Sequence, residues 1–362
     1  YLADRHEPNR LIGPALILGG VLAWSSIPIV SALGPGLGSA VPAIVLLSFF
    51  GFFPFAMVLT AVSPMVAKLR LQSLTETGEV VGGLSAAGTF GALFGTFFTG
   101  FVLVSAAPTR PIVVAVGLGL VIWGVVFTLR RGTGERPSVG LGLVGAAVLA
   151  LAVGPSGPCE FESAYACGRV VTDPDDPSLR FLHLDTLRHG AVDLDDPTHL
   201  EFRYINIIGD VIDALPDGPI DALHVGGGAF SVPAYINAVR PGSTNLVSEI
   251  DPLLIDVGRD ELGLVTGDDL EIVTGDARLT VAELPTDAYD VIVGDVFGGL
   301  TVPWHLTTTE GVAELDRVLR PGGVFVMDVS DGERNRFVEA QLATLAQLFE
   351  YRSVGVPVDA AL

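Results

Sequence analysis

Four long apolar runs, none containing a charged residue, constrain the first part of the chain more than any other feature. They cover residues 11–33, 40–62, 80–104 and 111–129. Each has about the ~20 residues that a helix needs to cross roughly 30 Å of hydrocarbon. A fifth run, residues 138–154, has 17 residues and either crosses as well or lies beneath the domain that follows. We therefore expect about five spans in residues 1–154, acting as an anchor because they hold no ionisable relay.

Basic residues gather in every second connection between these runs, and cytoplasmic loops are the ones that retain Lys and Arg. The connections at 34–39 and 105–110 hold only Arg110, whereas the others hold Arg5, Arg10, Lys68, Arg70, Arg130, Arg131 and Arg136. The pattern predicts a multi-pass protein of the cell membrane with its basic connections inside. If the fifth run crosses, everything after residue 154 is extracytoplasmic.

The only two cysteines, Cys159 and Cys167, lie just past the fifth run. Their proximity favours a disulfide, which persists only in an oxidising compartment; the alternative is two unpaired small apolar side chains. No further Cys or His stands at ligand spacing, so no metal site is expected. The pair agrees with an extracytoplasmic position for the second part of the chain.

The charge of residues 155–362 differs sharply from that of the anchor. This part has 12 arginines, no lysine and 36 acidic residues, a net charge of −24, against +3 for residues 1–154. Dense carboxylate without lysine is typical of proteins that work in concentrated salt, where screening cancels self-repulsion; the alternative is an acidic domain from an ordinary organism. Either way, the charge argues against a nucleic-acid partner.

Strands and helices alternate from Asp221 onward. The expected strands are "ALHVGGG", "NLVSEID", "LEIVTGD", "YDVIVGD" and "VFVMDVS". Five such units predict a parallel, doubly wound sheet whose ligand binds at the carboxyl ends of the strands. Because the chain begins at Tyr1 and ends just after an expected strand, we expect it to be a piece of a longer protein.

Four of the expected strands end in residues suited to an adenosyl ligand. Gly226, Gly227 and Gly228 follow the first strand, and Glu249, Asp276 and Asp295 follow the next three. Glycines allow close backbone approach, and an acid about 20 residues on accepts hydrogen bonds from ribose hydroxyls. The alternative is that these residues only form turns and caps.

Taken with "ESAY", "LHLD" and "EFRY", these motifs follow the order found in a known family. Over residues 160–355 the sequence resembles the spermidine synthases and other polyamine aminopropyltransferases, in particular membrane-anchored bacterial and archaeal forms, and we expect a halophilic archaeal source. The resemblance implies a Rossmann-like (class I methyltransferase-like) domain, residues 216–362, preceded by a small β subdomain, residues 155–215. It implies that decarboxylated S-adenosylmethionine binds at Gly226, Gly227, Gly228, Glu249, Asp251, Asp276 and Ala277.

The resemblance also assigns the reacting side of the site. Asp295 would be the base that deprotonates an attacking amine, with Tyr204 and His189 on the substrate side. Several family carboxylates are missing, however, because Ala229 replaces the Asp of "GGGD" and Gly298 replaces another Asp. A multiply charged amine needs such groups. Trp304 and His305, in the loop after the fourth strand, either line the substrate pocket or pack that loop.

Three functions therefore stay open: aminopropyl transfer to a small-molecule amine, methyl transfer from S-adenosylmethionine, and non-catalytic sensing of an adenosyl ligand. The expected partners are the lipid bilayer, the amine and a second copy of the chain. Adenosyl co-substrates are made inside cells, which conflicts with an extracytoplasmic domain. Either the fifth run does not cross, or the ligand is not that of the family.

Overall fold

The computed structural model describes residues 7–37, 41–71, 77–130, 139–154, 159–185, 187–296, 302–331 and 334–355. Gly298, one of the predicted departures, lies outside these residues. The chain forms two compact units, Tyr1–Pro158 and Cys159–Leu362, described separately below.

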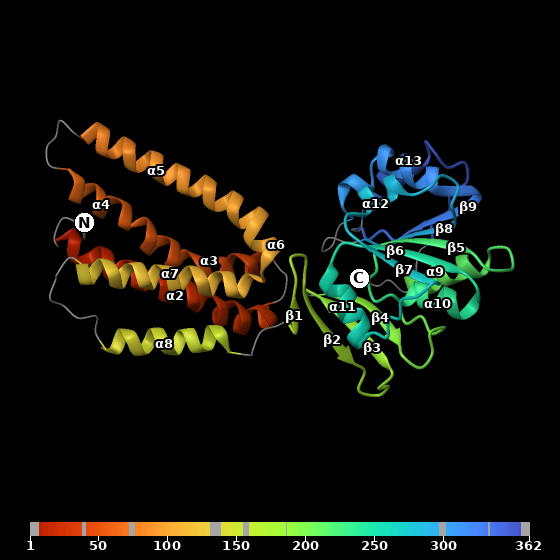
Figure 1. Ribbon diagram of the computed structural model, residues 1–362, viewed down its shortest axis with the longest axis horizontal. Coiled ribbons are helices and arrows are strands. Elements are labelled where there is room, and N and C mark those ends of the chain that lie inside the picture. Colours follow the sequence, from red (N-terminus) through yellow and green to blue (C-terminus); the bar gives the residue numbers. More distant parts are fainter. Residues whose placement is uncertain are drawn as a thin grey trace. The chain divides into compact units, whose positions relative to one another are not determined.

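The first unit is helical (Figure 1). Its elements are α2 (Pro8–Leu37), α3 (Val41–Thr60), α4 (Val62–Arg70), α5 (Thr77–Phe98), the π-helix η2 (Thr99–Leu103), α6 (Val104–Ala106), α7 (Thr109–Arg130) and α8 (Val139–Val153). Among the described residues, four stretches are long and apolar enough to cross a membrane: Pro8–Gly34, Val41–Arg70, Thr77–Ala106 and Thr109–Arg130. The four long apolar runs of the sequence thus form the predicted helices.

Glycines bring α2 and α7 into close contact. A Cβ placed on Gly20 would lie 2.5 Å from the carbonyl oxygen of Gly117, and one on Gly124 would lie 2.7 Å from that of Gly13. Trp24 packs over Gly117, and its indole N–H donates to the carbonyl of Val114 at 3.0 Å. Small residues permit this approach between apolar helices, where packing and not water exclusion drives association.

The fifth run forms α8, which is 15 residues long. At 1.5 Å per residue it extends about 22 Å, less than the roughly 30 Å of a hydrocarbon core. The guanidinium of Arg110, in the first turn of α7, donates to the carbonyl of Ala152 at 2.6 Å and to that of Gly154. The end of α8 therefore lies beside the start of α7; crossing by this segment stays a prediction.

The second unit begins with a four-stranded antiparallel sheet in the order β1-β2-β3-β4. The strands are β1 (Phe161–Glu162), β2 (Cys167–Thr172), β3 (Leu179–Leu184) and β4 (Leu187–Asp193). Cys159 and Cys167 form the predicted disulfide, with sulfurs 2.08 Å apart. It joins Cys159, two residues before β1, to the first residue of β2.

A five-stranded parallel sheet in the order β7-β6-β5-β8-β9 follows. Its strands are β5 (Asp221–Val225), β6 (Thr244–Glu249), β7 (Leu270–Thr274), β8 (Tyr289–Gly294) and β9 (Leu319–Met327). Its helices are α9 (Arg203–Asp213), α10 (Ser231–Val239), α11 (Pro252–Glu261), α12 (Ala277–Glu283), η3 (Trp304–Leu306), α13 (Thr309–Val318) and α14 (Arg336–Leu345). The order reverses at β5, so the doubly wound sheet predicted from the sequence is confirmed.

Apolar side chains on both faces of this sheet are buried under helices, as expected of a parallel sheet. Ala222 and Val291 pack with Ile208 and Ile236 of α9 and α10. On the opposite face, Leu223 and its neighbours pack against α12 and α13. Figure 1 shows these two helices on the other side of the sheet from α9 and α10. The sheet is therefore covered on both sides, and its ligands are restricted to the ends of the strands.

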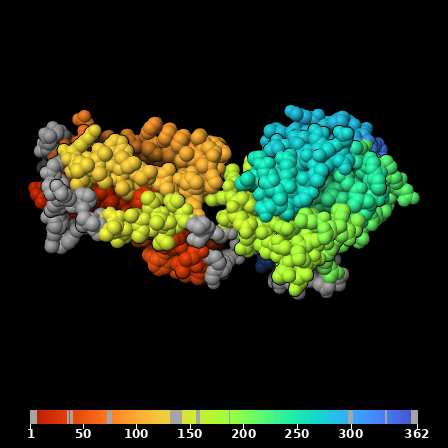
Figure 2. Space-filling model, turned by 60° about the horizontal axis from the view of Figure 1, so that its bottom comes forward, coloured from red at the N-terminus to blue at the C-terminus, as the bar shows by residue number. Residues whose placement is uncertain are grey.

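Within the second unit, the small antiparallel sheet packs against the part that holds the parallel sheet. The space-filling view shows this contact between the yellow-green and cyan segments (Figure 2). Leu182 and Val192 of this sheet share a buried cluster with Leu254 of α11 and with Ala229, which follows the glycine turn. The two sheets thus meet at the carboxyl end of β5.

Candidate active site

A turn of three glycines follows β5. Gly226 and Gly228 have φ of +98° and +52°, a region that glycine adopts without a steric cost. A Cβ on Gly226 would collide with the carbonyl oxygen of Asp295, and one on Gly227 would lie 2.5 Å from the ring of Phe230. The turn therefore requires glycine and presents bare backbone at the end of the strand.

Glu249, the last residue of β6, lies against this turn and is only 6% exposed. One of its oxygens accepts the N–H of Gly227 at 2.8 Å, and the other accepts the N–H of Asp251 at 2.8 Å. Burial raises the pKa of Glu249, while these backbone donors oppose the rise. Each carboxylate oxygen keeps a further lone pair, so the group can still accept hydrogen bonds from a ligand's hydroxyls.

Asp251 connects the small sheet to this acid. Its carboxylate caps α11 by accepting the N–H of Leu253 at 3.0 Å and also accepts the hydroxyl of Ser163 from the β1–β2 turn. Asp251 is 5% exposed. Direct contact between Asp251 and the cofactor stays a prediction.

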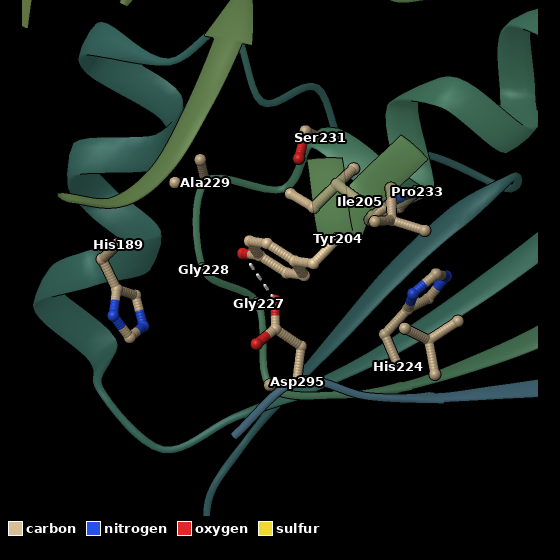
Figure 3. A pocket seen from close by; sticks show the side chains of 14 residues that line it. His189, Tyr204, Ile205, His224, Gly227, Gly228, Ala229, Ser231, Pro233 and Asp295 are labelled. Atoms are coloured by element: carbon tan, nitrogen blue, oxygen red, sulfur yellow. Dashed lines mark hydrogen bonds between the residues drawn. The ribbon is translucent and has the colours of Figure 1, made fainter. Parts of the chain in front are cut away.

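A hollow opens beside the glycine turn. It brings together His189 from β4, Tyr204 from α9, the glycines 226–228 and Asp295 after β8 (Figure 3). The hydroxyl of Tyr204 donates to a carboxylate oxygen of Asp295 at 3.3 Å, drawn as the dashed line. The predicted base and both predicted substrate-side residues therefore face one space.

The pKa of Asp295 rises to about 7, first through burial and then through the negative charge of Asp328; the Tyr204 hydrogen bond acts in the opposite direction. Burial and both carboxylates raise the pKa of Tyr204, which stays protonated as a donor. A carboxylate with a pKa near 7 is well matched to remove a proton near neutral pH.

Asp328, which follows β9, was not among the predicted site residues. Burial raises its pKa, and its charge acts on both Asp295 and Tyr204. Its position in the sequence carried the same signal as the others, since it ends the fifth parallel strand in "VFVMDVS". Parallel strands place their carboxyl ends at one edge of the sheet, which would have identified it.

Asp276 and Ala277 lie at the end of β7, away from the residues that line this hollow. Asp276 caps α12 through the N–H of Arg278 at 2.9 Å, and its carboxylate lies 3.8 Å from His305. Ala277, the first residue of α12, is buried in the core cluster that α12 and α13 share with the sheet. Trp304 is 75% exposed, and its ring lies edge-on to that of His305 with the centroids 5.8 Å apart. His305 reaches the predicted adenine side, and both expectations for this loop stay predictions.

Ala229 and His189 lie where the small sheet covers the hollow. A Cβ on Gly190 would lie 2.7 Å from that of Ala229, so the backbone of β4 passes directly over the residue that replaces the family's Asp. The imidazole of neighbouring His189 faces the hollow (Figure 3), and burial lowers its pKa. Among the described residues, no group of three or more metal-ligating side chains is present.

His224 lies within β5 and also lines the hollow. It is 2% exposed, and its imidazole shares a hydrogen bond of 2.9 Å with Asn245. Burial lowers its pKa to about 4. It is thus a neutral core residue beneath the hollow.

Comparisons with known proteins find relatives of this chain. A polyamine aminopropyltransferase of Chromobacterium violaceum is 30% identical over 186 residues, which is 51% of this chain and 69% of that protein. One from Vibrio vulnificus is 28% identical over 144 residues, and there the chain spans about half (48%) of the relative. No family model matches the chain.

A solved structure, that of a probable spermidine synthase from Corynebacterium glutamicum, superposes with a TM-score of 0.50 at 29% identity. The match covers 52% of this chain and 70% of the other. These similarities confirm the predicted fold and the predicted class of enzyme, a transferase. With 30% identity across more than two thirds of the Chromobacterium relative, the chain belongs to the polyamine aminopropyltransferase family.

Proposed function

We propose that the second unit transfers an aminopropyl group from decarboxylated S-adenosylmethionine to a small-molecule amine. The observation that carries this proposal is Asp295, a carboxylate with a pKa of about 7 that faces the hollow beside the glycine turn and accepts the hydroxyl of Tyr204. The names of the relatives support the same reaction.

The residues present fit the adenosyl co-substrate. The glycines 226–228 form a cradle that a side chain would fill, and Glu249 keeps lone pairs for two ribose hydroxyls. Asp276 with His305 would bound the adenine side. The co-substrate supplies an activated carbon next to a sulfonium sulfur, and the chain's residues hold it and manage the proton.

The step itself is a direct displacement. The amine nitrogen forms a bond to the aminopropyl carbon, the carbon–sulfur bond breaks, and the sulfur leaves as a neutral thioether. Asp295 takes the proton that the arriving ammonium must lose, and Tyr204 fixes the carboxylate from α9. Positioning and proton removal together account for the rate.

A second candidate, methyl transfer from S-adenosylmethionine, is favoured by Ala229. No carboxylate stands at this position to repel the cofactor's own carboxylate, and the residue is 4% exposed beneath β4. The two reactions share the glycine turn, Glu249 and the displacement chemistry. They differ in the group transferred and in the cofactor bound.

We further propose that the protein is membrane-bound with the second unit outside the cytoplasm. The Arg110 contacts hold the end of α8 beside the start of α7, and α7 starts at a connection without further basic residues. The chain would then leave the bundle on the side opposite the basic connections. A site there requires delivery of its co-substrate across the membrane. The net charge of −24 supports adaptation to a halophile's salt.

Calorimetric titration of the full-length protein with each cofactor tests the function, followed by mass spectrometry of reactions with a panel of amines. Aminopropylated product from the decarboxylated cofactor would support the first candidate, and methylated product from S-adenosylmethionine the second. If neither cofactor binds at millimolar concentration, the transferase assignment of this site is wrong.

A further inference from the structure

Two carboxylates stand side by side at the ends of neighbouring strands. Gly294 of β8 pairs with Met327 of β9 in the parallel ladder, and the N–H of Asp328 donates to the carbonyl of Gly294 at 2.9 Å. Asp295 and Asp328 therefore follow paired positions. The charge of Asp328 raises the pKa of Asp295, and both charges raise the pKa of Tyr204.

Within the described part of the chain, no arginine, lysine or histidine lies at ion-pair distance from either carboxylate. Buried carboxylates are normally paired, because an uncompensated charge loses its hydration. The arrangement thus presents two partly buried acids with no cation of the protein between them. A cationic ligand would supply the missing partner.

The hollow on the Asp328 side is apolar. It is lined by Val225, Leu306, Leu315, Phe325 and Met327 together with Asp328. Among the described residues that line it, Asp328 is the only charged one. Apolar walls of this kind favour contact with a hydrocarbon chain, whereas a second ammonium group would find no carboxylate there.

We propose that Asp295 and Asp328 together bind the ammonium group of the acceptor, and that this acceptor is a small primary amine whose carbon chain lies in the apolar hollow. Asp328 keeps its charge while Asp295 takes the proton. The inference rests on the proposed transfer reaction and names its acceptor class. It makes Asp328 a second residue that touches the substrate.

The chemistry of amines explains the need for two acids. An alkylamine, like the lysine side chain with its reference pKa of about 10.4, arrives as an ammonium ion, and it must lose a proton before its lone pair can attack. One carboxylate is neutralised by the cation, and the remaining negative charge strengthens the other as a base. Asp328 thus retains the ammonium while making the proton transfer to Asp295 more favourable.

Three other titratable side chains line the hollow with Asp295. Tyr204 from α9 is held protonated, and burial lowers the pKa of His189 from β4. His224 in β5, with a pKa of about 4, is bound to Asn245. Because all three are the same in the Asp328 variant and its control, a difference between these two proteins near neutral pH reports on the acid pair.

The test uses the full-length protein with Asp328→Asn and, as a matched control, Asp316→Asn on the exposed side of α13. Asp328→Asn should raise KM for n-butylamine by about 10- to 100-fold, the range of a lost hydrogen bond to a charged group. The acid limb of the pH–rate profile should move to lower pH, because a neighbouring negative charge has been removed. A KM and an acid limb equal to those of Asp316→Asn would overturn the inference.

Two further measurements separate this inference from the proposed function. Calorimetric binding of n-butylamine in the presence of 5′-methylthioadenosine needs no turnover, and it should be lost in Asp328→Asn. If the wild type binds the amine through Asp328 but transfers nothing to it, only the proposed reaction is wrong. Preference for 1,4-diaminobutane or a longer polyamine over n-butylamine would overturn the assigned acceptor class.

Discussion

Adding one methyl group at Gly190 is expected to separate the small sheet from the glycine turn. A Cβ at this position would lie 2.7 Å from the Cβ and 3.1 Å from the backbone nitrogen of Ala229, whereas carbon atoms in contact prefer roughly 3.5–4.0 Å. Ala229 is 4% exposed, and Leu182 and Val192 pack beside it. Neither side can move freely, so Gly190→Ala overpacks a buried contact.

Overpacking of this kind typically costs about 1–3 kcal/mol. For a unit of roughly 200 residues, each kcal/mol lowers Tm by about 2–4 °C, so we expect a loss of about 2–12 °C. The same displacement moves the backbone next to Gly228, so binding of an adenosyl cofactor should weaken as well. The compensating variant Gly190→Ala/Ala229→Gly removes the contact at 2.7 Å and should recover part of both losses.

Thermal unfolding of the detergent-solubilised full-length protein, followed by near-ultraviolet circular dichroism in 1 M salt, measures the effect. Gly267→Ala is the matched control, since its added methyl would meet only the carboxylate of Asp269, at 3.2 Å. A Tm for Gly190→Ala within about 1 °C of this control would refute the packing argument. Equal losses in the single and the compensating variant would show that Ala229 is not the obstacle.

Four further outcomes are expected. Turnover should rise with pH around a midpoint of about 7, because Asp295 acts as a base only when ionised. Asp295→Asn should slow turnover about 10²- to 10⁴-fold while cofactor affinity changes little, and an unaffected kcat would exclude Asp295 as the base. Glu249→Gln should weaken cofactor binding by about 10- to 150-fold in calorimetry, whereas the exposed Glu271→Gln should not. Tm should increase between about 0.1 and 1 M salt as the Debye length falls from ~10 to ~3 Å, and a flat curve would contradict salt adaptation. On intact cells, an impermeant thiol reagent should label Cys159 and Cys167 only after reductant; labelling that needs lysis would place the second unit inside.

The residues that end the parallel strands could be found from sequence because their position follows from local pattern alone. Gly226 and Glu249 follow apolar runs bounded by turn residues, and the topology of a doubly wound sheet then gathers them at one edge. The same reasoning extends to Asp328, which lay in a predicted strand and was not assigned a role. Its pairing with Asp295 became visible only through the β8–β9 register.

Contacts between the two sheets could not be read from the sequence. Ser163 and Asp251 are 88 residues apart, and Gly190 lies 39 residues before Ala229. No periodicity links such positions, since they are set by how the small sheet docks onto α11. For the same reason the hydrogen bonds of Asp251 to α11 and to Ser163 could not be predicted from the sequence.

The disulfide gives the adenosyl site a dependence on how the protein is prepared. Cys167 pairs in register with Glu162, so the bridge to Cys159 encloses the turn that carries Ser163. From Ser163, hydrogen bonds run through Asp251 and Glu249 to the backbone of Gly227. In material expressed in a reducing cytoplasm, or purified with thiols, Glu249 and the ribose-binding end of the site would therefore be held less firmly than in the oxidised protein.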